Sequence, residues 1–475
     1  MSTIANLSIR ESKRRKLILS GNLWKTVFWI TTPLAIYALF NYFYGFIDFL
    51  LVSTMGTADV ATVFFIEDIK GAISAIGGGI AIGGAVFVAR HYGANDLESA
   101  RRNAAQTLIL ALSISTIVAI IVILFALPIL RLFNAPDEII NTGLGYYFVQ
   151  MASTIVIAVN SVYMGIERSK GNTTMVMLLN IIAMIIKLIL STVFVLVLHK
   201  GIIYVGFATL IAQLFLMILG VYILFNKKNS IAIRFKDLKP DLAIMKGILV
   251  VAIPVIGGKF FFSLGRVIVN GLAAAYGTIA IAAFGLASKL AGGPGAIAGI
   301  FEESTASIAS QNIGGGNLRR AFKTYFVANT QAVIAGFLGM LVVVLSIDTM
   351  ITWFTTNSTP EFAILAKSIF AFEKFSIVTG ATTSIVAALF IGFKISKVTL
   401  ILNLLRIYVF RIPVLLLMLH FGVGPVALGY VMFISNTSTA LVAILLIVMF
   451  YRKVKHFGYL DMRYQDSTPL VKANQ

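Results

Sequence analysis

Charged side chains interrupt several long apolar runs of this 475-residue sequence. A charge at the centre of a bilayer costs about 2.5–3.5 kcal/mol on insertion scales, so such residues face the protein interior or a watery cavity. Carboxylates there can exchange a coupling ion, and Lys or Arg side chains can hold an anionic group. The candidates for coupling-ion binding are Asp48, Glu67, Asp68, Glu302 and Glu303. The candidates for the substrate cavity are Lys70, Lys187, Lys259, Lys289, Glu373, Arg406, Arg411, Phe40 and Phe261.

Some of the acids also have a purely structural interpretation. Glu67 and Lys70 are three residues apart, a spacing at which they would neutralise each other on one helix face. Glu302 and Glu303 are adjacent, so they point about 100° apart around a helix and at most one can face a cavity squarely. The other acid is then expected to pair with a Lys or Arg.

The basic candidates inside the apolar runs also need partners for their charges. Lys187 lies in the middle of an apolar run and has no acid within a helical turn. Lys259 follows Pro254 by about one turn, where an interrupted helix can expose backbone groups to a cavity. Both ammonium groups are expected in a central cavity, either paired with acids of other helices or facing substrate. Arg406 and Arg411 have the alternative role of structural partners for the acids.

The elements that position these residues are membrane-spanning helices. The chain is 59% hydrophobic and 12% charged, with a mean hydropathy of +0.94. A soluble domain of this size carries about twice that share of charge, and a membrane helix needs about 20 apolar residues. Apolar segments cover roughly 24–52, 60–90, 104–127, 139–163, 172–198, 202–225, 246–275, 280–311, 323–346, 362–392, 397–419 and 424–450. These segments predict an all-α integral membrane protein of about twelve helices.

Charge along the chain predicts its topology. The net charge is +19, and basic residues bracket the apolar segments, which argues for orientation rather than nucleic-acid binding. Alternate connections hold nearly all of the basic residues, whereas the others hold only Arg131 and Lys200. The positive-inside rule then places both termini in the cytoplasm of a plasma membrane, expected to be a bacterial inner membrane. The expected parts are a basic segment 1–23, an N-lobe 24–225, a linker 226–245, a C-lobe 246–451 and a tail 452–475.

The two halves of the chain repeat each other. At a shift of 221 residues, Pro33 meets Pro254 and Gly93 meets Gly314; further along, His199 meets His420. Each half holds six spans, an even number, so both have the same orientation. This arrangement is typical of a parallel repeat related by an axis along the membrane normal, as in two-lobed carriers.

The order and spacing of these landmarks resemble the MATE (multidrug and toxin extrusion) transporters from about residue 21 to 452. The motifs are Pro33 and Pro254 early in helices 1 and 7, Asp48 to Gly56 late in helix 1, the turns 89–96 and 310–317 after helices 2 and 8, and the loop 165–173. The resemblance implies a V-shaped, two-lobed fold with a central cavity. It also implies export driven by a proton or sodium gradient, often of amphipathic organic cations.

Two departures from the family pattern concern coupling. Many members carry an Asn in helix 5 and an Asp four residues later. In our alignment, this sequence has Lys187 and Ser191 at these two positions. An acid expected early in helix 7 falls near Gly258 and Lys259. An ammonium and a hydroxyl do not form a cation site, so we expect proton rather than sodium coupling.

The function that this sequence predicts is secondary active export of a polar or amphipathic small molecule by a monomer that contacts membrane lipids. The alternative is a flippase for a lipid-linked saccharide or an anionic amphiphile. A channel, a receptor or an enzyme has less support, since filter motifs, ligand domains and nucleophile–base or metal constellations are lacking. No cofactor, catalytic residue or metal ligand is expected, and the chain has no cysteine. The glycines at 77–79 and 83–84 precede no GKS or GKT signature and favour close helix packing over nucleotide binding.

Overall fold

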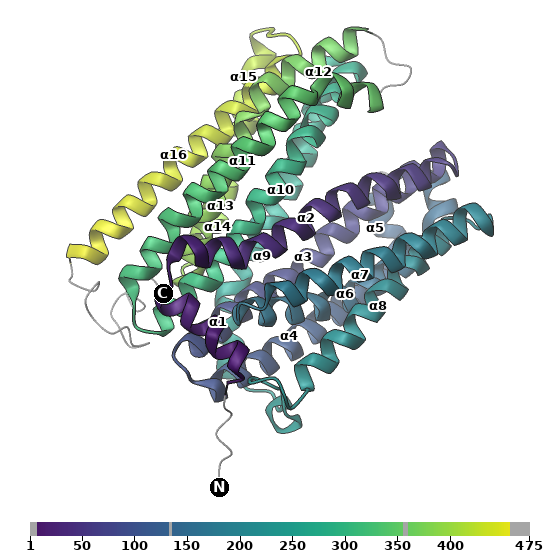
Figure 1. Cartoon of the computed structure of the whole chain (residues 1–475). Coiled ribbons are helices and arrows are strands. Elements are labelled where there is room, and N and C mark those ends of the chain that lie inside the picture. The colour runs from purple at the N-terminus through teal and green to yellow at the C-terminus, as the bar shows by residue number, and fades with distance from the viewer. Residues whose placement is uncertain (1–6, 133–134, 355–359, 457–475) are drawn as a thin grey trace. The chain divides into compact units, whose positions relative to one another are not determined.

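The computed structural model describes residues 7–132, 135–354 and 360–456, and throughout these ranges the regular structure is helical (Figure 1). The first half contains α1 (Ile9–Ser20), α2 (Leu23–Ser53), α3 (Thr57–Gly93), α4 (Leu97–Leu124), α5 (Ala126–Leu132), α6 (Asp137–Ser169), α7 (Thr173–Thr192), η1 (Val193–Val197), α8 (Ile202–Phe225) and η2 (Phe235–Leu238). The second contains α9 (Leu242–Ala273), η3 (Ala274–Tyr276), α10 (Thr278–Gly314), α11 (Leu318–Phe354), α12 (Pro360–Glu373), α13 (Phe375–Gly392), α14 (Lys397–Leu404), η4 (Leu405–Arg411), α15 (Ile412–His420) and α16 (Ala427–His456).

Twelve helical segments among the described residues are long and apolar enough to cross a membrane, which confirms the predicted number. A helix suits this solvent because it satisfies its backbone hydrogen bonds internally. Two spans include π-helical turns: α7 continues through η1, and α14 continues through η4 into α15. Another span, Pro360–Gly392, is interrupted between α12 and α13 at Lys374.

The chain forms two compact units, each with its own core. Unit 1 comprises residues 1–20 and 32–256, and unit 2 comprises residues 21–31 and 257–475. In unit 1, α3 packs against α4 and α6, and α8 packs against α6 and α7. In unit 2, α10 packs against α11, α12 and α13, and α16 packs against α12 and α13 (Figure 1). The predicted lobe boundaries at 24–225 and 246–451 stay a prediction.

Two of the three divisions between the units fall inside a proline-containing helix, and the third lies between α1 and α2. Pro33 lies just after the division in α2, and Pro254 lies just before the division in α9. Proline removes one backbone N–H from the helix, so these two divisions coincide with a weakened point of the hydrogen-bond ladder.

Backbone geometry supports the internal repeat and corrects its register. The eight described residues with positive φ form four pairs. Gly56 and Gly277, like Asn95 and Gly316, stand 221 positions apart, whereas Gly171 and Lys394, like His199 and Gly422, stand 223 apart. The alignment of His199 with His420 is therefore wrong, because the second half contains two extra residues between Gly316 and Lys394.

The basic N-terminal segment forms a helix that docks on unit 1. Ser8 and Glu11 cap α1 reciprocally: the Ser8 amide donates to Glu11 Oε2 at 3.0 Å, and the Glu11 amide donates to Ser8 Oγ at 3.2 Å. Ser230 Oγ donates to Glu11 Oε1 at 2.9 Å. Burial opposes the charge of Glu11, but hydrogen bonds from Ser8 and the nearby Lys170 ammonium outweigh it and hold the pKa of this carboxyl below its usual value. Arg15 donates to the carbonyls of Tyr92 and Gly93, at the end of α3.

The glycine series in α3 permits close approach of α6. A Cβ built on Gly77 would lie 2.5 Å from Ala158 Cβ and 2.9 Å from Ala158 Cα, whereas a Cβ on Gly78 would meet nothing within 4 Å. At Gly77, this supports the interpretation that the glycine series serves helix packing.

We expect Gly77→Ala to destabilise unit 1 by about 1–3 kcal/mol, because the clash involves backbone and cannot be relieved by rotating a side chain. Gly78→Ala is the matched control and should change stability by no more than about 1 kcal/mol. Unfolding temperatures of the two purified variants test this. Equal unfolding temperatures would mean that α3 and α6 are not held this closely.

Candidate functional site

A cavity of about 370 Å³ lies within unit 1 between α2, α3, α7 and α8. Its polar lining comes from all four helices and combines acids, amines, amides and hydroxyls. Residues of α2 recur along one face at helical spacing. The lining consists of Tyr37, Asn41, Tyr44, Gly45, Asp48, Val52, Val63, Phe64, Glu67, Lys70, Asn180, Ala183, Met184, Lys187, Thr209, Ala212 and Gln213.

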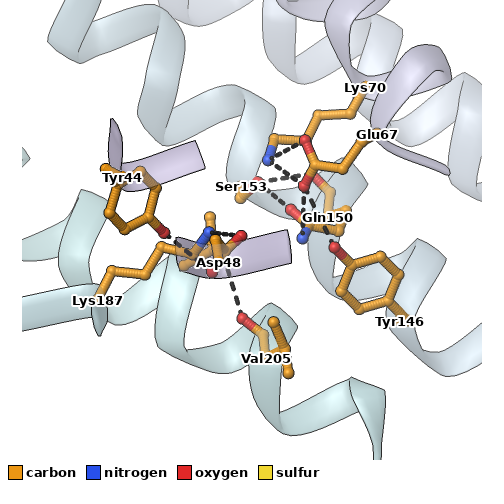
Figure 2. Close-up of polar contacts among 10 residues, drawn as sticks. Tyr44, Asp48, Glu67, Lys70, Tyr146, Gln150, Ser153, Lys187 and Val205 are labelled. Atoms are coloured by element: carbon orange, nitrogen blue, oxygen red, sulfur yellow. Dashed lines mark hydrogen bonds and ion pairs between the residues drawn. The ribbon is translucent and has the colours of Figure 1, made fainter. Parts of the chain in front are cut away.

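Lys187 meets Asp48 in this cavity, although 139 positions separate them in the chain (Figure 2). Lys187 Nζ on α7 lies 2.9 Å from Asp48 Oδ2 on α2, and the two side chains are only 14% and 21% exposed. Tyr44, one turn before Asp48, donates its hydroxyl to Asp48 Oδ1 at 3.2 Å. Its ring centroid lies 5.0 Å from Lys187 Nζ, within the range of a cation–π contact. Asp48, Lys187 and Tyr44 form what we call the Asp48 triad.

A second acid–amine pair lies on α3, at the spacing that the sequence indicated. Lys70 Nζ donates to Glu67 Oε1 at 2.8 Å and to Oε2 at 3.0 Å. Two side chains of α6 complete the arrangement: Tyr146 Oη and Gln150 Nε2 each donate to Glu67 Oε1 at 3.2 Å (Figure 2). Glu67 therefore ties α3 to α6, as Asp48 ties α2 to α7.

The cavity of unit 1 is balanced in charge. Two carboxylates, Asp48 and Glu67, face two amines, Lys70 and Lys187. Each carboxylate also accepts from a tyrosine hydroxyl. A polar ligand could replace one member of either pair, because an incoming cationic group could bind the carboxylate and an incoming anionic group could bind the amine.

Glu302 is the centre of a polar cluster in unit 2. It is partly buried on α10, contacts the hydroxyl of Ser384 on α13, and lies within electrostatic reach of Lys259 and Arg406. The Arg406 guanidinium also lies 5.4 Å from the ring centroid of Phe262. Glu302 is thus an acid within electrostatic reach of both cations, and the role of Arg406 as a structural partner for an acid stays a prediction.

Glu373 belongs to a second, more deeply buried network of unit 2. Ser288 Oγ donates to Glu373 Oε1 at 2.8 Å, and Glu373 Oε2 has no hydrogen-bond partner among the described residues. Arg411, at the end of the π-helical η4, lies within electrostatic reach of Glu373. It donates to Ser435 Oγ at 3.1 Å and to Asn436 Oδ1 at 3.4 Å. Both Glu373 and Arg411 are buried.

The remaining candidates, and Lys259, differ in how far they are exposed. Asp68, Lys259 and Lys289 are exposed, and Glu303 is partly buried. Phe40 and Phe261 are 51% and 40% exposed. The aromatic residues of α2 that do line the cavity are Tyr37 and Tyr44, which share a helix face with Asp48, whereas Phe40 lies on another face.

The two residues of α7 that were aligned with the family motif differ in position. Lys187 lines the cavity, whereas Ser191 is buried and is not part of the lining. Asn180 and Met184, which are also four residues apart, line the cavity as well. Tyr146 and Gln150 carried no sequence signal because they reach Glu67 from another helix.

Within the described ranges, no group of three or more His, Asp or Glu side chains could hold a metal ion. The cavity of unit 1 contains paired charges in membrane-spanning helices, an arrangement that suits binding and exchange of ions and polar solutes.

Comparison with known proteins identifies similar chains. The model of the MatE family matches residues 33–193 and 254–417. The multidrug export protein MepA of Staphylococcus haemolyticus is 23% identical over 353 residues, which are 74% of this chain and 77% of that protein. An outward-facing structure of a multidrug resistance MATE family transporter of the MOP superfamily matches 92% of this chain and 98% of that chain, with a TM-score of 0.88 and 23% identity. A MOP superfamily transporter from Pyrococcus furiosus, described as having a binding pocket of reverse polarity, matches 93% and 99% of the two chains at the same TM-score and identity.

Proposed function

The chain belongs to the MatE family of multidrug efflux transporters, and we propose that it exports a polar or amphipathic organic solute by proton antiport. Export would proceed by alternating access from the cytoplasm, with both termini on the cytoplasmic side of a bacterial inner membrane. The observation that carries this proposal is the charge-balanced cavity of unit 1, built inside membrane-spanning helices. Charges at such positions destabilise insertion, so their presence in a lined cavity favours a transport role.

The geometry favours Glu302 as the group that exchanges the proton. Its carboxylate lies near both Lys259 and Arg406. A proton on Glu302 would cancel the negative charge that the two cations share and leave them to repel each other. Electrostatic repulsion in a medium of low dielectric is strong, so protonation here can shift the balance between two conformations. Uptake of the proton from outside would accompany release of substrate.

The substrate must suit a cavity with both signs of charge and aromatic walls. Tyr37, Tyr44 and Phe64 provide apolar surface, and the two acid–amine pairs provide polar contacts. A drug-like or metabolite-like molecule with a polar group fits this description. The curated relatives named as multidrug export proteins favour the same class of substrate. No observation favours the alternative of a lipid-linked saccharide.

Transport by the purified protein in proteoliposomes tests the proposal. We expect an imposed pH gradient to drive uptake of a cationic fluorescent dye into the proteoliposomes by transporter molecules inserted inside-out, with equal rates in sodium and choline buffers. An anionic lipid phosphate should not be moved. Transport that requires sodium would contradict proton coupling, and movement of the lipid phosphate alone would favour the flippase.

A further inference from the structure

We propose that the ammonium group of Lys187 is a resident cation: it occupies the position at Asp48 that an inorganic monovalent cation would otherwise take, and it excludes sodium from unit 1. This inference deepens the proposed function, because it assigns the ion selectivity of the cavity to one side chain. Its test below measures binding and stability, so it does not depend on transport.

The contacts of Asp48 are those of an occupied cation site. One carboxylate oxygen, Oδ2, lies 2.9 Å from Lys187 Nζ, and the other, Oδ1, accepts the hydroxyl of Tyr44 at 3.2 Å. The Tyr44 ring adds a cation–π contact on the same ammonium. Lys187 reaches Asp48 from α7, and its own helix provides no acid within a turn. The ammonium is therefore held by α2 (Figure 2).

Oxygen atoms suited to a hard cation line the same cavity. Asn180 Nδ2 donates to the Val176 carbonyl at 2.8 Å, so the amide orientation is determined and its Oδ1 is left as the group for other partners. Thr209 contributes a hydroxyl, and Asp48 contributes the carboxylate. Alkaline-earth cations take carboxylate, amide and hydroxyl oxygens as ligands, and the same hard oxygen donors suit sodium. Without Lys187, these groups would form a site of net negative charge.

Tethering explains why a free cation does not displace Lys187. A group that is already attached competes at an effective concentration in the millimolar range or above when the geometry is favourable. A sodium ion added to the present cavity would also bring a fifth charge to two acids and two amines. An uncompensated charge in a poorly solvated site is destabilising. The cavity therefore favours the tethered ammonium over sodium.

The experiment uses the full-length protein in detergent at constant ionic strength. Its unfolding temperature is measured in sodium, potassium and choline chloride. We expect no sodium-specific shift for the wild type. Lys187→Met should be less stable in choline, and its unfolding temperature should rise with the logarithm of the sodium concentration once that concentration exceeds the dissociation constant.

Three further variants make the result specific. Lys200→Met is the matched control, because the Lys200 ammonium also lies over a tyrosine ring, at 5.7 Å from Tyr204, but is exposed. It should show no sodium effect. The double change Lys187→Met with Asp48→Asn should abolish the sodium effect, because the carboxylate is gone. Lys187→Gln gives a polar replacement in case Lys187→Met does not fold, and it should also become sodium-sensitive.

Two outcomes would overturn the proposal. A sodium-specific shift in the wild type would mean that Lys187 does not exclude the ion. Folded Lys187→Met or Lys187→Gln protein that ignores sodium would mean that the pair only joins α2 to α7. Failure of proton-driven transport with these binding results intact would count against the proposed function and leave the resident cation standing.

Discussion

Glu302→Gln is expected to reduce pH-gradient-driven transport to the level of protein-free liposomes while the protein remains in the membrane. Glutamine preserves the shape of the side chain and its contact with Ser384 but cannot exchange a proton. It also leaves Lys259 and Arg406 permanently without the charge that they share. Dye uptake under an imposed pH gradient, normalised to the amount of reconstituted protein, is the measurement.

Two companion variants locate the effect of Glu302→Gln. Glu361→Gln changes an exposed acid in the first turn of α12 and should retain transport. Glu303→Gln tests the neighbouring acid, whose side chain points about 100° away around the helix. Full pH-driven transport with both Glu302 and Glu303 replaced would contradict the assignment of coupling to this part of α10.

Breaking the Asp48 triad should show strong coupling between its two charges. We expect Asp48→Asn and Lys187→Met each to lower stability, because each leaves the opposite charge in a cavity where it is at most about one-fifth exposed. The double variant should recover much of the loss, with a coupling energy of about 0.5–3 kcal/mol. All three variants should lose transport, since the cavity no longer exchanges charged partners.

Unfolding temperatures in choline buffer and dye transport together test this cycle. Lys200→Met again serves as the control for loss of an ammonium near a tyrosine. Additive effects of the two single changes on stability would mean that Asp48 and Lys187 do not interact in the membrane protein. Recovery of transport in the double variant would mean that the pair is structural.

Local patterns in the sequence were sufficient for much of the architecture. Apolar runs of membrane-spanning length predicted the twelve spans that the structure contains. The repeat followed from proline and glycine positions, because these residues impose backbone geometry wherever they occur. The Glu67–Lys70 pair followed from i, i+3 spacing on one helix, and the structure contains it at 2.8 Å. Each of these features depends on residues that are close in the chain or on backbone constraints.

Contacts between helices could not be predicted from such local patterns. The repeat shifts by two residues between Gly316 and Lys394, and the shift became visible only from the residues with positive φ, such as His199 and Gly422. The α1 helix was predicted as a basic segment, and its docking through Glu11 and Arg15 depends on residues as distant as Ser230. The family alignment placed the helix 5 motif at Lys187 and Ser191, and the structure adds that Lys187 lines the cavity together with Asn180 and Met184, whereas Ser191 does not.

The pairing of Lys187 with Asp48 shows most clearly what the sequence determined and what only the tertiary structure decided. The sequence by itself determined that an ammonium stands in the middle of a span with no acid within a turn, and so that a partner must come from elsewhere. Only the tertiary structure selected Asp48, because the choice depends on how α2 and α7 are rotated and packed to bring two side chains 139 positions apart to 2.9 Å. Helical periodicity specifies which face of a helix a residue occupies, whereas packing decides which other face it meets.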